Sequence, residues 1–165
     1  MEKKNNITLE INGWDTGIKF SASHFIPTHK RCSRLHGHDY GIRFKIHGEL
    51  NESMILMDFT EIKKNLKKIA DELDHYVLLP STDKFYTISK KGESVEVLFE
   101  NKRYVFPAVD VKFIDVDLPS AESLSIFIAR EFIKNIKIPE NIDKIEVCVD
   151  EGKGQGSWYS LSVNE

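Results

Sequence analysis

The chain has 165 residues, of which 41% are hydrophobic and 30% charged, and these proportions favour a single compact domain. The formal net charge of -3 gives no reason to expect a nucleic acid or an anionic membrane surface as the partner. No apolar run approaches the ~20 residues that a transmembrane helix needs, and the charged N-terminus has no apolar stretch behind it to act as a secretory signal.

Three strands are predicted in the first third of the chain. Residues 6–14 and 16–25 are predicted to be strands joined by a tight turn at DTG, and a loop follows over roughly residues 26–35. Residues 38–50 alternate apolar and polar side chains, which is the period of a half-buried strand. We therefore expect these segments to contribute to a sheet with one buried face.

Two helices are predicted from apolar residues that recur three or four positions apart. The first covers residues 58–73, and either Asp58 or Thr60 can cap its start. The second covers residues 120–136, with Ser120 as its N-cap.

A β-rich segment, residues 81–117, is predicted to be an inserted β-hairpin between the two helices, with Asn101-Lys102 at its turn. Two further strands are predicted at 143–149 and 157–163, joined by a glycine-rich turn. Strands in consecutive hairpins with helices on one face indicate an α+β fold, which we expect to form one domain over residues 1–165.

Three histidines form a candidate metal site. His36 and His38 are two residues apart on a predicted strand, so both imidazoles point to the same side and can converge on one ion at roughly 2.0–2.1 Å. Gly37 between them leaves room for the two ligands. His24 ends an earlier strand that could lie alongside, and three nitrogen ligands with an open fourth position are typical of catalytic zinc. The alternative is a polar strand edge without a metal.

Cys32 precedes His36 by four residues and has Lys30, Arg31 and Arg34 as neighbours. Positive charge near a thiol favours the thiolate, which beside a metal-bound substrate is a competent general base. The alternative is an inert loop cysteine. Because the second cysteine, Cys148, lies in a strand-like run, free thiols fit better than a disulfide, and we expect a cytoplasmic protein.

Asp74 and His75 end the first predicted helix, where the aspartate could orient an imidazole or relay a proton. The local sequence favours the alternative of a capping pair at a helix C-terminus. Glu151 follows a strand, and its carboxylate could accept two parallel hydrogen bonds from an N–C–NH2 edge, although a solvated turn glutamate is the simpler interpretation. His29 and His47 are predicted to be an exposed loop residue and a polar-face residue.

Five short runs, in the order FSASHF, CSRLHGH, LDHYVL, SAES and VDEG, resemble the 6-pyruvoyl-tetrahydropterin synthase superfamily. The cysteine separated from HGH by three residues resembles the 6-carboxytetrahydropterin synthase branch, which acts in 7-deazaguanine synthesis for queuosine and archaeosine. The resemblance covers about residues 16–80 and 117–163. The segment 81–117 departs from compact members of the superfamily, which have a shorter loop between the helices.

This resemblance implies Zn2+ held by His24, His36 and His38, with Cys32 as the proton-abstracting residue. The implied substrate is the small molecule 7,8-dihydroneopterin triphosphate, cleaved to 6-carboxytetrahydropterin, acetaldehyde and triphosphate. One alternative is the 6-pyruvoyl reaction, in which a lyase eliminates triphosphate without losing carbons. Another is a catalytically silent scaffold that binds zinc or pterin.

The resemblance also implies a second proton-transfer pair, Asp74 and His75, and a pterin anchor, Glu151. Ser120 and Glu122 fall at positions beside the pterin pocket. The implied architecture is the tunnelling fold, with a four-stranded antiparallel sheet and two helices. Three subunits close a barrel and two trimers stack, which places the active sites between subunits of a homo-oligomer.

Overall fold

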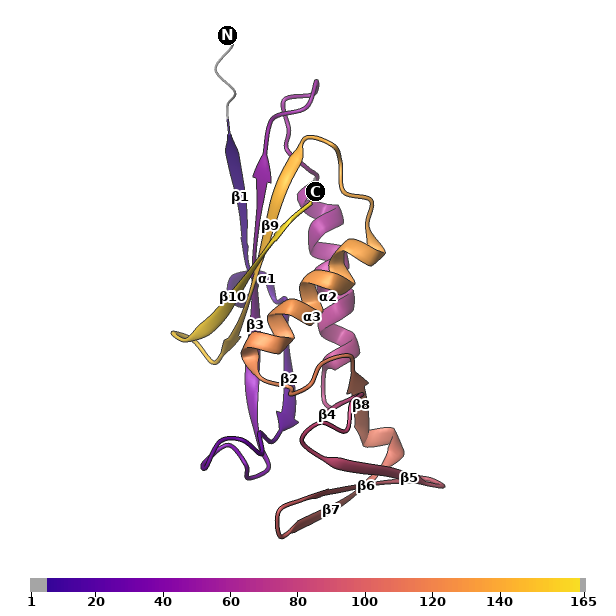
Figure 1. Cartoon of the computed structure of the whole chain (residues 1–165). Coiled ribbons are helices and arrows are strands. Elements are labelled where there is room, and N and C mark those ends of the chain that lie inside the picture. Colours follow the sequence, from indigo (N-terminus) through magenta and orange to yellow (C-terminus); the bar gives the residue numbers. More distant parts are fainter. Residues whose placement is uncertain (1–5, 164–165) are drawn as a thin grey trace.

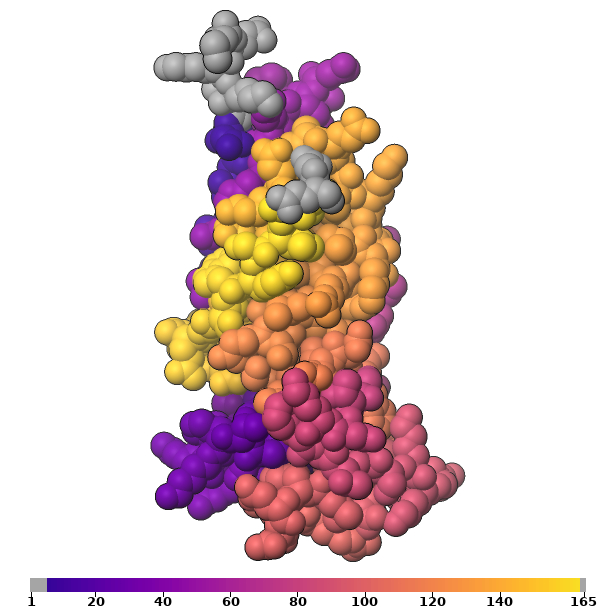
Figure 2. Space-filling view, viewed as in Figure 1, coloured from indigo at the N-terminus to yellow at the C-terminus, as the bar shows by residue number. Residues whose placement is uncertain are grey.

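The longest strand, β3, runs along the long axis of the molecule and organises the sheet (Figures 1 and 2). The computed structural model describes residues 6–163. On one side β3 pairs with β9, which pairs with the edge strand β10; on the other side it pairs with β2 near its start and β1 near its end. These antiparallel strands are β1 (Ile7–Asn12), β2 (Lys19–His24), β3 (His36–Gly48), β9 (Ile142–Glu151) and β10 (Gly156–Ser162).

The sheet contains more strands than the four antiparallel strands that the sequence predicts. Because β1 and β2 share one position beside β3, the antiparallel part does have four positions, and the predicted α+β class is confirmed. Two short strands, β4 (Val77–Pro80) and β8 (Val111–Ile114), extend it in parallel beyond β2. A single turn of helix, α1 (Gly13–Thr16), stands between β1 and β2 where a tight turn is predicted, and Gly17 ends it at φ 75°.

Two helices, α2 (Phe59–Leu73) and α3 (Ala121–Asn135), cover one face of the sheet (Figure 1). Asp58, rather than Thr60, is the N-cap of α2, since its carboxylate accepts the N–H of Thr60 at 2.7 Å. The predicted cap of α3, Ser120, is confirmed. Within the described part of the chain, no helix is long and apolar enough to cross a membrane.

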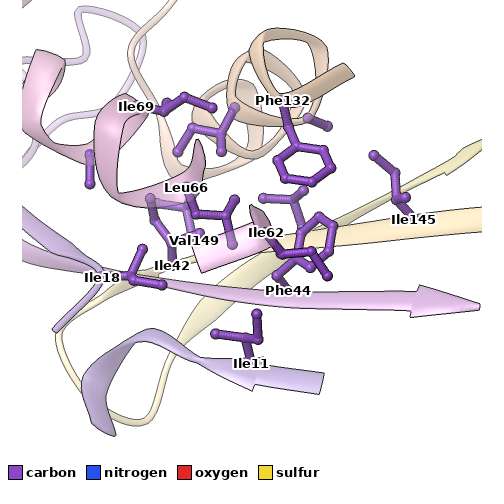
Figure 3. Packing of buried hydrophobic residues seen from close by; sticks show 14 of the residues in the cluster. Ile11, Ile18, Ile42, Phe44, Ile62, Leu66, Ile69, Phe132, Ile145 and Val149 are labelled. Carbon is purple, nitrogen blue, oxygen red and sulfur yellow. The ribbon is translucent and has the colours of Figure 1, made fainter. Parts of the chain in front are cut away.

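The main core lies between β3 and the two helices. Ile42 and Phe44 of β3 are fully buried and face Ile62 and Leu66 of α2 (Figure 3). The ring of Phe44 also packs on Phe132 of α3, with 4.6 Å between the ring centroids. Burial of each such side chain stabilises the fold by roughly 1.5–3 kcal/mol. The alternation that predicted this strand is therefore the pattern that attaches it to the helices.

The segment between the helices forms a three-stranded antiparallel sheet, called the small sheet below, instead of the predicted hairpin. Its strands are β5 (Thr87–Lys91), β6 (Ser94–Phe99) and β7 (Lys102–Pro107), followed by a 3-10 turn, η1 (Ala108–Asp110). The turn between β6 and β7 consists of Glu100 and Asn101, one residue earlier than predicted, and Glu100 adopts the left-handed conformation at φ 51°.

A second core joins the small sheet to the end of β2. Phe25, which directly follows β2, stacks on Phe99 and on Tyr104, each with 5.0 Å between ring centroids. The hydroxyl of Tyr86 donates to the carbonyl oxygen of Phe25 at 2.6 Å. The small sheet is therefore packed against the chain where β2 leads into the loop containing Cys32.

A polar cluster around Glu146 lies on the sheet between β9 and its two neighbours. The carboxylate accepts from Ser160 at 2.9 Å and from Lys144 at 3.2 Å, and it lies 2.7 Å from Nε2 of His47. His47 is thus on the polar face, as predicted. Burial acts to raise the pKa of Glu146, but these hydrogen bonds outweigh it and lower the pKa to about 2.

We expect acid to destabilise the fold through Glu146. A carboxyl group with a lowered folded-state pKa stabilises the fold fully above its unfolded pKa, and this contribution is lost as the pH falls through about 2. After allowance for its 22% exposure, the loss between pH 6 and pH 2 should be about 2 kcal/mol. Denaturant unfolding of the wild type and Glu146→Gln at both pH values measures it. An equally steep pH dependence in the variant would contradict the assignment.

Candidate metal and substrate site

The candidate site begins where the core ends along β3. Alternate residues share one face of a strand, so the face that carries Tyr40 into the core continues toward the start of β3 as His38 and His36. His24, the last residue of β2, is the direct cross-strand partner of His36. The sheet register thus brings together the three histidines that the sequence predicts as ligands.

The three imidazoles are close enough to bind one ion. One ligand nitrogen from each of His24, His36 and His38 lies within 4.8 Å of the others. The Nε2 atoms of His24 and His36 are 3.1 Å apart. Ligands of a tetrahedral ion with bonds of about 2.0–2.1 Å are roughly 3.3 Å apart, so this spacing suits a metal such as zinc.

Hydrogen bonds on the far side of two rings fix their orientation. Nδ1 of His24 donates to the carbonyl oxygen of Pro119 at 2.6 Å, and Nδ1 of His36 donates to that of Arg34 at 2.7 Å. A carbonyl oxygen only accepts, so both Nδ1 atoms carry the proton and both Nε2 atoms present a lone pair, that of His24 with the Tyr40 hydroxyl 3.4 Å away. Nε2 of His38 is buried and has no hydrogen-bond partner among the described residues, and a bound metal would provide one.

His24 is neutral at ordinary pH, as a metal ligand must be. Burial is the main cause that lowers its pKa to about 4, while the bond to the Pro119 carbonyl acts in the opposite direction. The neighbouring rings of His36 and His38 lower it further. A donor set of three imidazoles fits a divalent transition metal.

Gly37 has a different function from the one predicted. A Cβ atom at this position would lie 2.8 Å from the carbonyl oxygen of Ala22 on the neighbouring strand. Glycine therefore permits the close approach of β2 and β3, instead of making room for the ligands themselves. This approach is what places His24 beside His36.

A cavity of about 360 Å3 lies beside the histidines, within the usual size range of small-molecule sites. Its wall includes four of the residues predicted to act on the substrate: Cys32, Ser120, Glu122 and Glu151. It also includes two residues that the sequence does not single out for such a site, His29 and Gln155.

Cys32 is half-buried at the cavity wall, and its loop is held by local hydrogen bonds. Its N–H donates to Nδ1 of His29 at 3.2 Å, and its carbonyl oxygen accepts from the N–H of Ile26 at 2.7 Å. His29 is exposed, as predicted, yet it also supports the loop that presents the thiol. Cys32 and Cys148 are both free thiols, so the expectation of no disulfide is confirmed.

Glu151 ends β9 and is paired with Tyr40 in the sheet register. Its two carboxylate oxygens lie 3.9 Å from Nε2 of His24 and 3.8 Å from Nε2 of His38. The N–H of Glu151 donates to the carbonyl oxygen of Gln155 across the glycine-rich turn at 3.1 Å. The carboxylate, 24% exposed, therefore lies against two of the three imidazoles at the edge of the glycine-rich turn.

The start of α3 completes the wall through Ser120 and Glu122. The Ser120 hydroxyl accepts the N–H of Ser123 at 3.3 Å, so this residue both caps the helix and borders the cavity. A helix N-terminus carries partial positive charge, which favours an anionic ligand group nearby. Lys30, Arg31 and Arg34 are exposed on the adjoining loop.

Asp74 and His75 do not line this cavity. They lie beside β2, where Asp74 accepts the N–H of Ser21 at 2.7 Å and contacts Nδ1 of His75 at 2.7 Å. Burial acts to raise the pKa of Asp74, but the bonds from Ser21 and His75 outweigh it and lower the pKa. The His75 side chain is 82% exposed, and its backbone is in the left-handed region at φ 64°, a strained conformation that often marks functional residues.

Comparison with known proteins agrees with this geometry. A family model described as 6-pyruvoyl tetrahydropterin synthase matches residues 15–162. A Methanocaldococcus jannaschii protein, provisionally named 6-carboxy-5,6,7,8-tetrahydropterin synthase, is 37% identical over 92% of this chain and 94% of its own. A Pyrococcus horikoshii protein with the same provisional name is 31% identical over 81% and 80%.

The fold also matches solved structures. The crystal structure of 6-pyruvoyl tetrahydropterin synthase from Plasmodium vivax has a TM-score of 0.88 at 23% identity, with 96% of this chain and 99% of that chain covered. This similarity confirms the predicted tunnelling fold.

Proposed function

The chain belongs to the 6-pyruvoyl tetrahydropterin synthase family, and we propose that it is a zinc-dependent 6-carboxy-5,6,7,8-tetrahydropterin synthase. The proposed reaction converts 7,8-dihydroneopterin triphosphate into 6-carboxytetrahydropterin, acetaldehyde and triphosphate, in 7-deazaguanine synthesis. One observation carries the proposal: three imidazoles converge closely enough to bind one ion, and two of them, His24 and His36, line the cavity that also presents Cys32. The names of the Methanocaldococcus jannaschii and Pyrococcus horikoshii relatives support the carboxy-forming outcome.

The proposal gives roles to the three histidines, to Cys32 and to Glu151. His24, His36 and His38 would hold Zn2+, which when bound supplies Lewis-acid polarisation of a substrate oxygen and so makes the neighbouring C–H more acidic. Cys32 would take up that proton from a substrate held against the cavity wall. Glu151 would accept two hydrogen bonds from N3–H and the 2-amino group of the pterin ring, which fixes the ring in one orientation.

We expect purified protein to contain about one zinc per chain, bound through the three histidines. His38→Ala should lower the zinc content by at least ~10-fold, because it removes one of three ligands and leaves an incomplete donor set. His47→Ala is the matched control, since His47 is another half-buried histidine on β3 but bonds to Glu146 instead. Metal analysis by mass spectrometry measures both. Equal zinc loss in the two variants would contradict the assignment.

We infer a homo-oligomer from the position of Asp74 and His75. The pair is exposed beside β2 and does not border the cavity of its own chain. Within residues 6–163, β10 pairs only with β9 and β1 pairs only with β3, so the antiparallel sheet has two edges with free hydrogen-bonding groups. A ring of three subunits, stacked in pairs as the family resemblance implies, would join these edges. Asp74 and His75 would then serve the cavity of a neighbouring subunit.

The second candidate function is the 6-pyruvoyl reaction, whose name the family model carries. The same zinc site and proton-transfer residues would serve it. The spacing of Cys32, which three residues separate from the HGH run, favours the carboxy-forming branch. A catalytically silent scaffold is disfavoured because the thiol, the aspartate–histidine pair and the carboxylate anchor are all present.

The decisive experiment is incubation of the zinc-loaded protein with 7,8-dihydroneopterin triphosphate, followed by chromatography of the pterin products and an assay for acetaldehyde. We expect 6-carboxytetrahydropterin and one equivalent of acetaldehyde. A 6-pyruvoyl product without acetaldehyde would replace the proposal with its alternative. No turnover by protein with full zinc content would leave only the scaffold.

A further inference from the structure

We propose that the small sheet anchors the loop that carries Cys32 (residues 26–34, the Cys32 loop below), and that Lys102 is the residue that positions Cys32. Lys102 can affect turnover only if Cys32 has the role given above, so that part rests on the proposed function. The anchoring itself rests on contacts between described residues. Lys102 and the Cys32 loop are far apart in sequence, since Lys102 and Ser33 are separated by 69 positions along the chain.

The Cys32 loop is closed by its own backbone. The N–H of Ile26 donates to the carbonyl oxygen of Cys32 at 2.7 Å, the N–H of His29 to that of Ile26 at 3.0 Å, and the N–H of Ser33 to that of His29 at 2.8 Å. Because these bonds link the beginning of the loop to its end, the loop moves largely as one piece. Its placement over the cavity therefore depends on what holds its two ends.

Lys102 holds the C-terminal end of the loop. Its Nζ donates to the carbonyl oxygen of Ser33 at 2.6 Å and lies 2.8 Å from the Ser33 hydroxyl oxygen. Ser33 is only 7% exposed and directly follows Cys32. Charge-assisted hydrogen bonds are roughly twice as strong as neutral ones. Lys102 is also the first residue of β7, placed there by the left-handed turn at Glu100.

Tyr86 and the aromatic residues of the small sheet hold the N-terminal end. The Tyr86 hydroxyl, which is buried, donates to the carbonyl oxygen of Phe25, one residue before the loop. Phe25 itself is fully buried against Phe99 and Tyr104. Figure 2 shows the surface of the small sheet directly beside that of the N-terminal third of the chain at the same end of the molecule. Both ends of the Cys32 loop are thus fixed to the same small sheet.

The consequence is a thiol whose position is set by a separate structural unit. A displacement of about 1 Å at a reacting group can cost on the order of 10²-fold in rate. Loss of the Lys102 bonds should free the Ser33 end while Phe25, His24 and His38, which the loop does not hold, stay in place. We therefore expect catalysis to suffer before zinc binding or pterin binding does.

The test compares Lys102→Met with Lys102→Arg and with a matched control, Lys91→Met. Lys91 belongs to the same small sheet, but its Nζ bonds to Glu96 at 2.6 Å instead of to the Cys32 loop. Hydrogen–deuterium exchange at the amides of residues 26–34 reports loop opening. Steady-state kinetics with 7,8-dihydroneopterin triphosphate, on samples of matched zinc content, report kcat and KM separately.

For Lys102→Met we expect at least ~10-fold faster exchange in the Cys32 loop and at least ~10-fold lower kcat, with KM changed by less than ~3-fold. Lys102→Arg should recover most of kcat, since a guanidinium also donates to a carbonyl and a hydroxyl. Lys91→Met should resemble the wild type. If Lys102→Met does not fold, Ser33→Ala, which removes one of the two acceptors, should show the same pattern with smaller changes.

Unchanged loop exchange in Lys102→Met would overturn the inference, as would equal effects in Lys91→Met. A fall in the folded fraction with an unchanged kcat per folded, zinc-loaded molecule would reduce Lys102 to a purely structural residue and also overturn it. Failure of the proposed function is a separate outcome: the wild type would show no turnover, yet Lys102→Met would still exchange faster, which supports the anchoring.

Discussion

Replacement of Cys32 by alanine is expected to lower kcat by about 10³-fold while the protein keeps its zinc and its fold. General acid–base residues contribute roughly 10²- to 10⁴-fold to rate. The Cys32 thiol lies in the cavity wall and could take up a substrate proton there. The side chain makes no hydrogen bond that holds the loop, since the loop bonds of Cys32 come from its backbone. Steady-state kinetics, zinc analysis and circular dichroism measure the three properties.

The control for this variant is Cys148→Ala. Cys148 is fully buried on β9, and burial raises the pKa of its thiol to about 12, so it stays protonated and unreactive. We expect this variant to keep its kcat, although it should lose some stability from the small cavity. Undiminished turnover in Cys32→Ala would remove the thiol from the mechanism, whatever the behaviour of Cys148→Ala.

Replacement of Glu151 by glutamine is expected to weaken pterin binding by about 100-fold, with zinc content unchanged. The carboxylate would lose one of two charge-assisted hydrogen bonds, and the new amide NH2 would face the 2-amino group of the ring. Breaking such a paired charge typically costs roughly 2–5 kcal/mol. Calorimetric titration with 7,8-dihydroneopterin, which lacks the triphosphate, isolates this contact.

Glu146→Gln is the matched control for this titration, because Glu146 lies on the same strand and does not line the cavity. It should bind the probe as the wild type does. The carboxylate of Glu151 also lies within 4 Å of two imidazole nitrogens, so a competing role is as a fourth metal ligand. Loss of zinc in Glu151→Gln, together with loss of probe binding, would favour that role over the pterin anchor.

The helices and the central strand could be predicted because their signals are local. The apolar repeat of α2, its cap Asp58 and the alternation along β3 each depend on residues within one element. Strands β4 and β8 were not predicted as a parallel pair, since four apolar residues carry no clear period and the pairing joins distant segments. The turn at Glu100 was misplaced because the preference of asparagine for turns pointed one residue too far.

The candidate site was predictable to the extent that it follows the register of one sheet. His36 and His38 share a face by simple alternation, His24 ends a strand that could lie alongside, and Cys32 stands four residues before His36 among basic neighbours; the family resemblance then assigned roles to all four. His29 and Lys102 escaped prediction for different reasons. His29 does not stand at a sequence spacing from His36 and His38 that would mark it as part of the same site. Lys102 reaches the Cys32 loop only because the small sheet packs beside that loop. Contacts of that kind depend on tertiary structure, and they produce no repeating pattern of apolar and polar residues from which they could be predicted.

The bond from His24 to the carbonyl oxygen of Pro119 ties a candidate metal ligand to the turn that leads into α3. A cation bound to Nε2 would withdraw electrons from the ring and make Nδ1–H a better donor. Metal binding would therefore strengthen the hydrogen bond that joins β2 to the start of that helix. Part of the binding free energy is therefore also folding free energy. Thermal denaturation should therefore give a higher Tm when the ion is bound. Part of that gain would come from α3, although the side chains of this helix contribute none of the three ligand nitrogens.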